Sequence, residues 1–371
     1  MTCYFCAQIK NMMQGYMRNI TSGYKTLFYF FCGCAFLLTA CNNNGSSTRK
    51  APDVSEVKAE IKTVRLDLEM ANIDSNHVGE GLAMLHNKYP DFFDFYIDTI
   101  MGLKVNGNYT DTAINVRKGV KPFLTNSDFR GLFDTLKKHF PDTKAIDADL
   151  DKGFKYMKHY FPNYKTPKVY YITTMLFNKL WAFTAGDSTV GIGLDMYLGE
   201  NYPFYKAPTV DIPDYMNPHL RPSYVPVALF TSIYENMHPF EMADKTLLDM
   251  IVQRGKEQYF LHQVLPFISD TTLFGYSEKQ LKWCETHEAD VYNFFIKQNL
   301  LYSSEFQTVI RYVMDGPNSS GMPIESPGNI GSWLGYRIAL AYVSNTGTDM
   351  NAVLKAGDPV KFLTDSKYKP R

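Results

Sequence analysis

The segment "IYENMHPF", residues 233–240, decides how this fold is interpreted. The pattern HExxH on a helix is the usual signature of a zinc peptidase, with two histidines on one helix face and the glutamate as general base. Glu235 and His238 match the glutamate and the second histidine, but Tyr234 occupies the first histidine position. One ExxH is close to what chance provides. The surrounding sequence must therefore show whether this is a former zinc site or an ordinary helix.

The residues around this segment predict two helices joined by a short turn. "VPVALFTSIYENMH" has helical periodicity and ends at Pro239, which cannot continue a helix. "KTLLDMIVQRGKEQYFLHQVLP", residues 245–266, follows with Thr246 or Asp244 as its N-cap. In one large class of zinc peptidases a helix at this spacing supplies the third ligand, a glutamate about 20 residues after the second histidine. The spacing in this chain is right for that arrangement.

The remaining periodicity predicts an α+β fold that is mostly helical. Apolar residues recur at helical spacing through the first part of the domain, about 53–165. A sheet region follows at about 166–200, where β-branched and aromatic runs are broken by glycine and aspartate. These runs predict three strands of a small antiparallel or mixed sheet, at 168–174, 180–186 and 188–199.

After the sheet, a loop rich in proline and tyrosine covers residues 200–224, and loops of that length are usually functional. A helical bundle is expected from about 224 to 371, with long helices at 277–303 and 329–347. We interpret the whole of 53–371 as a single degenerate zincin-like domain.

The N-terminus has the order of a bacterial lipoprotein signal peptide. Lys25 precedes an apolar run from about Leu27 to Leu38, and "LLTAC" then places Cys41 after small residues. The run is too short to span a bilayer comfortably, since a spanning helix needs about 20 apolar residues. Residues 1–40 are therefore the expected signal peptide, Cys41 the lipid attachment site, and 41–52 a flexible tether. An uncleaved membrane anchor is the alternative.

The residue after the lipidated cysteine bears on localisation. Asn42 follows Cys41, rather than the aspartate that commonly holds lipoproteins at the inner membrane. We expect an outer-membrane anchor with the domain on the periplasmic face. Cys284 is then the only cysteine of the anchored domain, so no internal disulfide is possible, and its helical surroundings indicate packing rather than reactivity.

Composition and motifs exclude several other classes of function. Lysine plus arginine and aspartate plus glutamate both number 38, which gives no indication of a nucleic-acid partner. A P-loop, a GxGxxG after a strand and a GxSxG nucleophile elbow are all missing from the sequence.

Four longer blocks have an unusual composition: "IGLDMYLGENYPFY", "TLLDMIVQRGKEQYFLHQVLP", "QLKWCETHEADVYNFFIKQNLLYS" and "GNIGSWLGYRIALAYV". Together with the lipoprotein signal, they resemble the gliding-motility-associated lipoprotein GldB family of Bacteroidetes over nearly all of the chain after Cys41. The resemblance implies a role in cell-envelope machinery connected with gliding motility. That family is in turn similar to predicted zinc peptidases in which the HExxH helix is followed by a helix with an E-G-x pair.

Carried over onto this chain, the zinc-peptidase pattern fails at its ligands. Tyr234 replaces the first ligand, and Arg254 in "QRGK" stands at the third. A phenol with a pKa near 10 is a poor ligand, and a guanidinium cannot ligate at all. The resemblance therefore implies a degenerate cleft of Tyr234, Glu235, His238, Arg254 and Tyr336, with Tyr336 as a packing aromatic. We expect Arg254 within salt-bridge distance of Glu235 or His238, because a buried Glu235 carboxylate needs compensation.

These expectations favour a non-catalytic pseudopeptidase that binds unidentified envelope proteins or a ligand, without a cofactor. One alternative is an active zinc metallopeptidase with Glu235 as general base, His238 as a ligand, and further ligands recruited from His262 or His287. A second alternative is a cell-wall glycan-binding lipoprotein, suggested by the aromatic residues expected to be exposed in the loop at 200–224.

Overall fold

The sheet is small and mixed, and its strands lie in the order β1 (Lys62–Arg65), β2 (Lys168–Ile172), β4 (Thr189–Gly193) and β3 (Ala182–Ala185). In the computed structural model, which describes residues 51–176 and 181–371, the central strand β2 (Lys168–Ile172) pairs in parallel with β1 and with β4 (Thr189–Gly193). Strand β3 (Ala182–Ala185) pairs antiparallel with β4. The three predicted strands and the mixed sheet are thus confirmed.

Strand β1 (Lys62–Arg65) lies in the region 53–165 that the sequence predicts to be helical, and no strand was predicted there. Its sequence KTVR has four residues, which is too short for a period of two to be distinguished from a helical pattern. Thr63 pairs with Val169 and Val64 with Tyr170, so this segment is a strand because β2 lies beside it. This distant partner cannot be seen in the local sequence.

Helices make up most of the described chain, and the predicted α+β, mostly helical class is confirmed. Between β1 and β2 the α-helices are α2 (Leu66–Ala71), α3 (Val78–Lys88), α4 (Phe93–Phe95), α5 (Lys121–Thr125), α6 (Ser127–His139) and α7 (Lys144–Tyr160). After β4 come α8 (Val225–Met237), α9 (Leu247–Val264), α10 (Asp270–Phe274), α11 (Glu278–Thr286), α12 (Glu288–Lys297), α13 (Phe306–Val309), α14 (Ile330–Thr346), α15 (Met350–Lys355) and α16 (Pro359–Ser366).

The predicted long helix at 277–303 is wrong, because the chain forms two helices, α11 and α12, with a break at His287. The His287 ring stacks on Trp283 with centroids 4.5 Å apart, and its Nδ1 lies 2.8 Å from the Trp283 carbonyl oxygen. The imidazole thus contacts the end of α11. Helix α12 buries Val291 and Phe295, so each helix has its own apolar face.

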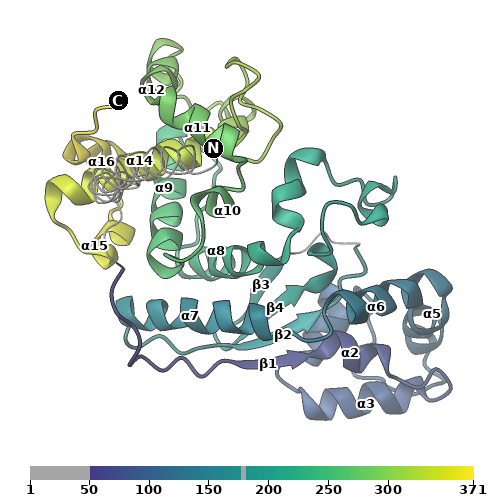
Figure 1. The fold of residues 1–371 in the computed structure, drawn as a ribbon. Helices are drawn as coiled ribbons and strands as arrows, with labels where there is room; N and C mark the ends of the chain where they lie inside the picture. Colours follow the sequence, from purple (N-terminus) through teal and green to yellow (C-terminus); the bar gives the residue numbers. More distant parts are fainter. Residues whose placement is uncertain (1–50, 177–180) are drawn as a thin grey trace, which may run out of the picture. The chain divides into compact units, whose positions relative to one another are not determined.

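Helix α8 connects the sheet to the helical half of the domain. It packs against β3, β4 and α7, while α9 packs against α7, α8 and α14 (Figure 1). The crossing of α9 and α14 is close because Gly255 and Gly335 meet there, and a Cβ on Gly255 would lie 2.3 Å from the Gly335 carbonyl carbon. This contact holds one side of α9 firmly against the C-terminal helices.

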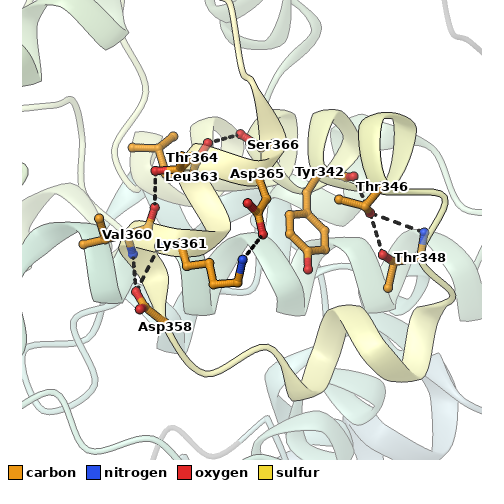
Figure 2. Close-up of polar contacts among 10 residues, drawn as sticks. All are labelled: Tyr342, Thr346, Thr348, Asp358, Val360, Lys361, Leu363, Thr364, Asp365 and Ser366. Atoms are coloured by element: carbon orange, nitrogen blue, oxygen red, sulfur yellow. Dashed lines mark hydrogen bonds and ion pairs between the residues drawn. The ribbon is translucent and has the colours of Figure 1, made fainter.

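The C-terminal helix α16 is capped at its start and carries polar contacts along its length (Figure 2). The Asp358 carboxylate accepts hydrogen bonds from the backbone amides of Val360 and Lys361, both at 2.9 Å, and so caps the helix start. Lys361 pairs with Asp365 one turn later at 2.8 Å. Tyr342 of α14 and Phe362 of α16 stack with centroids 4.1 Å apart.

The loop at 200–224 is more ordered than its composition suggests. It contains three short 3₁₀ helices, and the Tyr205 hydroxyl is buried, donating to the Asp195 carbonyl oxygen at 2.6 Å. Phe204 is 47% exposed, but the tyrosines of this loop are buried or half-buried. The expectation of many exposed aromatic residues here is therefore wrong, because most of these rings pack inward.

The predicted signal peptide at 1–40, the lipid attachment site Cys41 and nearly all of the tether at 41–52 lie outside the described residues. In the part of the chain that is described, no helix has the length and apolar content needed to cross a membrane.

Candidate binding cleft

The helix pair α8 and α9 positions the residues singled out in the sequence. Helix α8 ends at Met237, with His238 as its C-cap and Pro239 directly after. Helix α9 begins with a capping box, in which the Thr246 side chain accepts from the Asp249 amide and Asp249 accepts from the Thr246 amide. The predicted helix boundaries and the Thr246 cap are confirmed.

A cavity of about 250 Å³ lies between these helices near the turn that joins them. Four of the predicted cleft residues line it, namely Tyr234, Glu235, His238 and Arg254. Three apolar side chains, one amide and one further carboxylate complete the lining: Phe240, Met242, Met250, Gln253 and Glu257. The structure therefore brings together four of the five residues predicted for the cleft.

Arg254 is the centre of charge in this cleft. One of its guanidinium nitrogens, Nη1, lies 3.5 Å from Glu235 Oε1, which confirms the predicted approach. The same nitrogen lies 2.7 Å from Glu257 Oε2, so its stronger partner is Glu257. The Arg254 side chain is 19% exposed, and a guanidinium buried to this degree needs such partners.

The expectation that Glu235 is the buried carboxylate is wrong. Its side chain is 58% exposed, whereas that of Glu257 is 8% exposed. The reason is helix geometry: Glu235 lies near the outer end of α8, while Glu257 lies on the face of α9 that turns inward. A signal for Glu257 was present in the sequence, because it follows His238 by about 20 residues, the spacing of the third zinc ligand.

Burial and neighbouring charges together shift the pKa values of three residues in the cleft. Burial raises the pKa of the Glu257 carboxyl, Arg254 opposes this shift, and the negative charge of Glu235 adds to it. The pKa of Arg254 is raised further above its usual range, mainly by the charge of Glu257. Burial lowers the pKa of His238, and the positive charges of Lys256 and Lys355 lower it further. The imidazole is therefore uncharged at neutral pH.

The same residues can be tested as a zinc site. Glu235, His238 and Glu257 line one cavity, and the Nε2 of His238 is buried without a hydrogen-bond partner among the described residues. Arg254, however, places a permanent positive charge on both carboxylates at once. Within residues 51–176 and 181–371, no three His, Cys, Asp or Glu side chains are grouped to hold a metal ion. This arrangement of residues does not fit zinc.

Tyr336, the fifth residue predicted for the cleft, lies elsewhere. It belongs to α14 and stacks on His262 with ring centroids 3.9 Å apart. His262 is itself directed to the Gln258 carbonyl oxygen, 2.7 Å from its Nδ1, and to Asp270, 3.5 Å from its Nε2. Tyr336, His262 and His287 are not among the residues that line the cavity at Arg254. The two histidines considered as recruited ligands are therefore not placed beside His238.

A second cavity of about 200 Å³ continues along the groove between α8 and α9. It shares Glu235, Arg254 and Glu257 with the first cavity, so the ion pair lies where the two meet. It extends toward the start of α8 and is closed by α10, by residues 313–315 and by the start of α14: Leu273, Phe274, Val313, Met314, Asp315, Asn329 and Ser332. Sequence reasoning did not anticipate this part of the cleft, because its walls come from four separate segments.

The sequence model of a family described as "Gliding motility protein GldB" matches residues 47–370, nearly the whole of the chain. No curated protein and no solved structure matches the chain.

Proposed function

The chain belongs to the GldB family of gliding motility proteins, and from this premise we propose that it is a lipid-anchored envelope protein that acts by binding in the α8–α9 cleft, without catalysis. The family supplies the connection with gliding motility. The mode of action is argued from the cleft. The anchor at Cys41, on the periplasmic side and at the outer membrane, is argued from the sequence of the N-terminus.

The observation that carries the non-catalytic role is the position of Arg254. Its Nη1 contacts the carboxylates of Glu235 and Glu257 together, at 3.5 Å and 2.7 Å. A zinc peptidase needs three protein ligands and an open position for water, with a free glutamate as general base. Here a guanidinium pairs with the glutamate that would be the base. We regard the fold as a degenerate zincin-like arrangement in which a fixed cation stands where a metal ion would.

The cleft retains features suited to binding. The first cavity combines apolar side chains, such as Phe240 and Met242, with a few polar groups that point to one place. That combination is typical of ligand sites. The unidentified partner is, in this proposal, another protein of the cell envelope.

Metal analysis distinguishes this proposal from an active zinc metallopeptidase. The chain purified without chelator should contain no stoichiometric zinc, and His238→Ala should leave its metal content unchanged. Stoichiometric zinc that disappears in His238→Ala would overturn the non-catalytic role and favour the metallopeptidase.

A photo-crosslinking amino acid placed in the cleft tests the binding role in living cells. At Met242, which lines the first cavity, it should capture a discrete envelope protein identified by mass spectrometry. The matched control is the same amino acid at Lys279, exposed on α11 and outside both cavities. Identical capture profiles at the two positions would contradict binding through the cleft.

A further inference from the structure

We infer that the second cavity, between α8, α9 and α10, receives a cationic group, the ammonium or guanidinium at the end of a lysine- or arginine-like chain. The inference refines the proposed binding role and rests on it. The cavity has a volume of about 200 Å³, which at roughly 30 Å³ per water is the space of several waters or of one long side chain.

The charges that line this cavity favour a positive ligand. Three carboxylates face it, from Glu235, Glu257 and Asp315, against the single guanidinium of Arg254. His219 also lines the cavity, but burial lowers the pKa of its imidazole, so it adds no positive charge at neutral pH. The negative charges of Glu235 and Asp315 both raise the pKa of Glu257, as expected of carboxylates that line one cavity with it. Arg254 therefore leaves an excess of negative charge.

A separate observation is a buried hydrogen-bond acceptor of this cavity that lacks a donor. Gln258 lines the cavity and is only 7% exposed, yet its Oε1 is buried and accepts no hydrogen bond from the residues that the structure describes. An unpaired buried acceptor costs about 1–3 kcal/mol. A ligand ammonium or guanidinium would supply the missing N–H, whereas a neutral apolar group would not.

The remaining walls suit the chain that carries such a group. Val227, Leu273 and Val313 offer aliphatic contacts along which a methylene stem can lie. The Tyr224 ring also faces the cavity, and aromatic faces attract cations. Its neighbour His219 lies with its ring centroid 4.3 Å from that of Tyr224, which holds the tyrosine in place.

The ligand enters past the exposed side of the cavity. Asp315 is exposed and accepts a hydrogen bond from the Asn329 amide at 3.1 Å, and Met314 beside it is also exposed. The Glu235 side chain, on α8, is also exposed. The two exposed carboxylates meet a cation first, and the buried Glu257 and Gln258 lie deeper.

The test uses the full-length chain in detergent and four probes. Three are peptides, acetyl-Gly-Gly-X-Gly-Gly-amide, in which X is lysine, arginine or norleucine; the fourth is n-butylammonium. Isothermal calorimetry should show the lysine and arginine peptides binding at least about tenfold more tightly than the norleucine peptide, since hydrogen bonds to charged groups supply this much. The preference should weaken at high salt. Tight binding of n-butylammonium as well would identify a free amine, and binding of the peptides alone a polypeptide side chain.

Two variants and one control complete the test. Asp315→Asn removes an exposed charge without disturbing the core, and Gln258→Met removes the unpaired acceptor. Each should reduce the preference for lysine over norleucine, while Asp134→Asn, an exposed change on α6, should retain it. Equal binding of the lysine and norleucine peptides, no binding of the lysine peptide at millimolar concentration, or an unchanged preference in Asp315→Asn would each overturn the inference. None of these outcomes alters the crosslinking test of the proposed function.

Discussion

Arg254 and Glu257, three residues apart on α9, form the central ion pair of the cleft, with 2.7 Å between Nη1 and Oε2. Both side chains are largely buried, at 19% and 8% exposure. Buried ion pairs contribute little net stability, but removing one partner leaves an uncompensated charge. Each of these two buried charges is therefore compensated mainly by the other.

Arg254→Met should destabilise the protein by about 3–5 kcal/mol, because it strands the buried Glu257 carboxylate. The double variant Arg254→Met/Glu257→Leu should recover most of that loss, since neither charge is then present. Urea denaturation measures both. The matched control is Lys361→Met in the exposed Lys361–Asp365 pair, where we expect less than about 1 kcal/mol. A cost for Arg254→Met no larger than that of the control would contradict a structural role for the pair.

Gly255→Ala should be strongly destabilising, by at least about 1–3 kcal/mol, because its Cβ would lie 2.3 Å from the Gly335 carbonyl carbon. The atoms that this Cβ would meet are backbone atoms of Gly335, which cannot move aside as a side chain can. Gly131→Ala on α6 is the control: nothing lies within 4 Å of its Cβ position, so alanine should stabilise by about 0.5–1 kcal/mol. Thermal unfolding measures the melting temperature of both variants. Shifts of the same sign would contradict the close crossing of α9 and α14.

Lys256 should make stability depend on pH in the alkaline range. Burial lowers its pKa to about 8, from an ordinary value of 10.5. Between these values the unfolded state binds more protons than the folded state, so the free energy of unfolding rises with pH from about 8 to 10.5. This gain in the free energy of unfolding is lost again as the pH falls from 10.5 toward 8.

Lys256→Met should flatten this part of the stability curve, and Lys137→Met, an exposed change on α6, should not. Urea denaturation at several pH values between 8 and 10.5 gives the comparison. Parallel curves for wild type and Lys256→Met would show that Lys256 titrates in the same way in both states.

Cys41→Ser should abolish lipidation. Labelled palmitate should no longer be incorporated, and the chain should accumulate in an unprocessed or soluble form, since the acyl chains supply the membrane affinity. Cys284→Ala is the control, because Cys284 is buried in the core and should leave labelling intact. Normal membrane fractionation and labelling in Cys41→Ser would contradict the lipoprotein signal.

Much of the fold follows from local pattern. The helices at α8, α9 and α14 and the three strands after residue 165 lie where periodicity and capping residues predicted them. The two misses have different causes. Strand β1 needs the distant β2 beside it, whereas the break at His287 comes with a local contact to Trp283, four residues earlier, which helical periodicity does not reveal. In the cleft, the approach of Arg254 to Glu235 was predicted from charge and spacing and is confirmed.

By itself the sequence determined the helical register of α8 and α9, the replacement of a ligand by Tyr234, and the presence of a fixed positive charge at Arg254. These depend on residue type and on a period of 3.6, which neighbouring residues define. The tertiary structure alone decided that Glu257 rather than Glu235 is the buried carboxylate, and that Tyr336 packs on His262 away from the cleft. Burial depends on what packs against each helix face, and for this cleft those neighbours come from α10, α14 and residues 313–315, far along the chain.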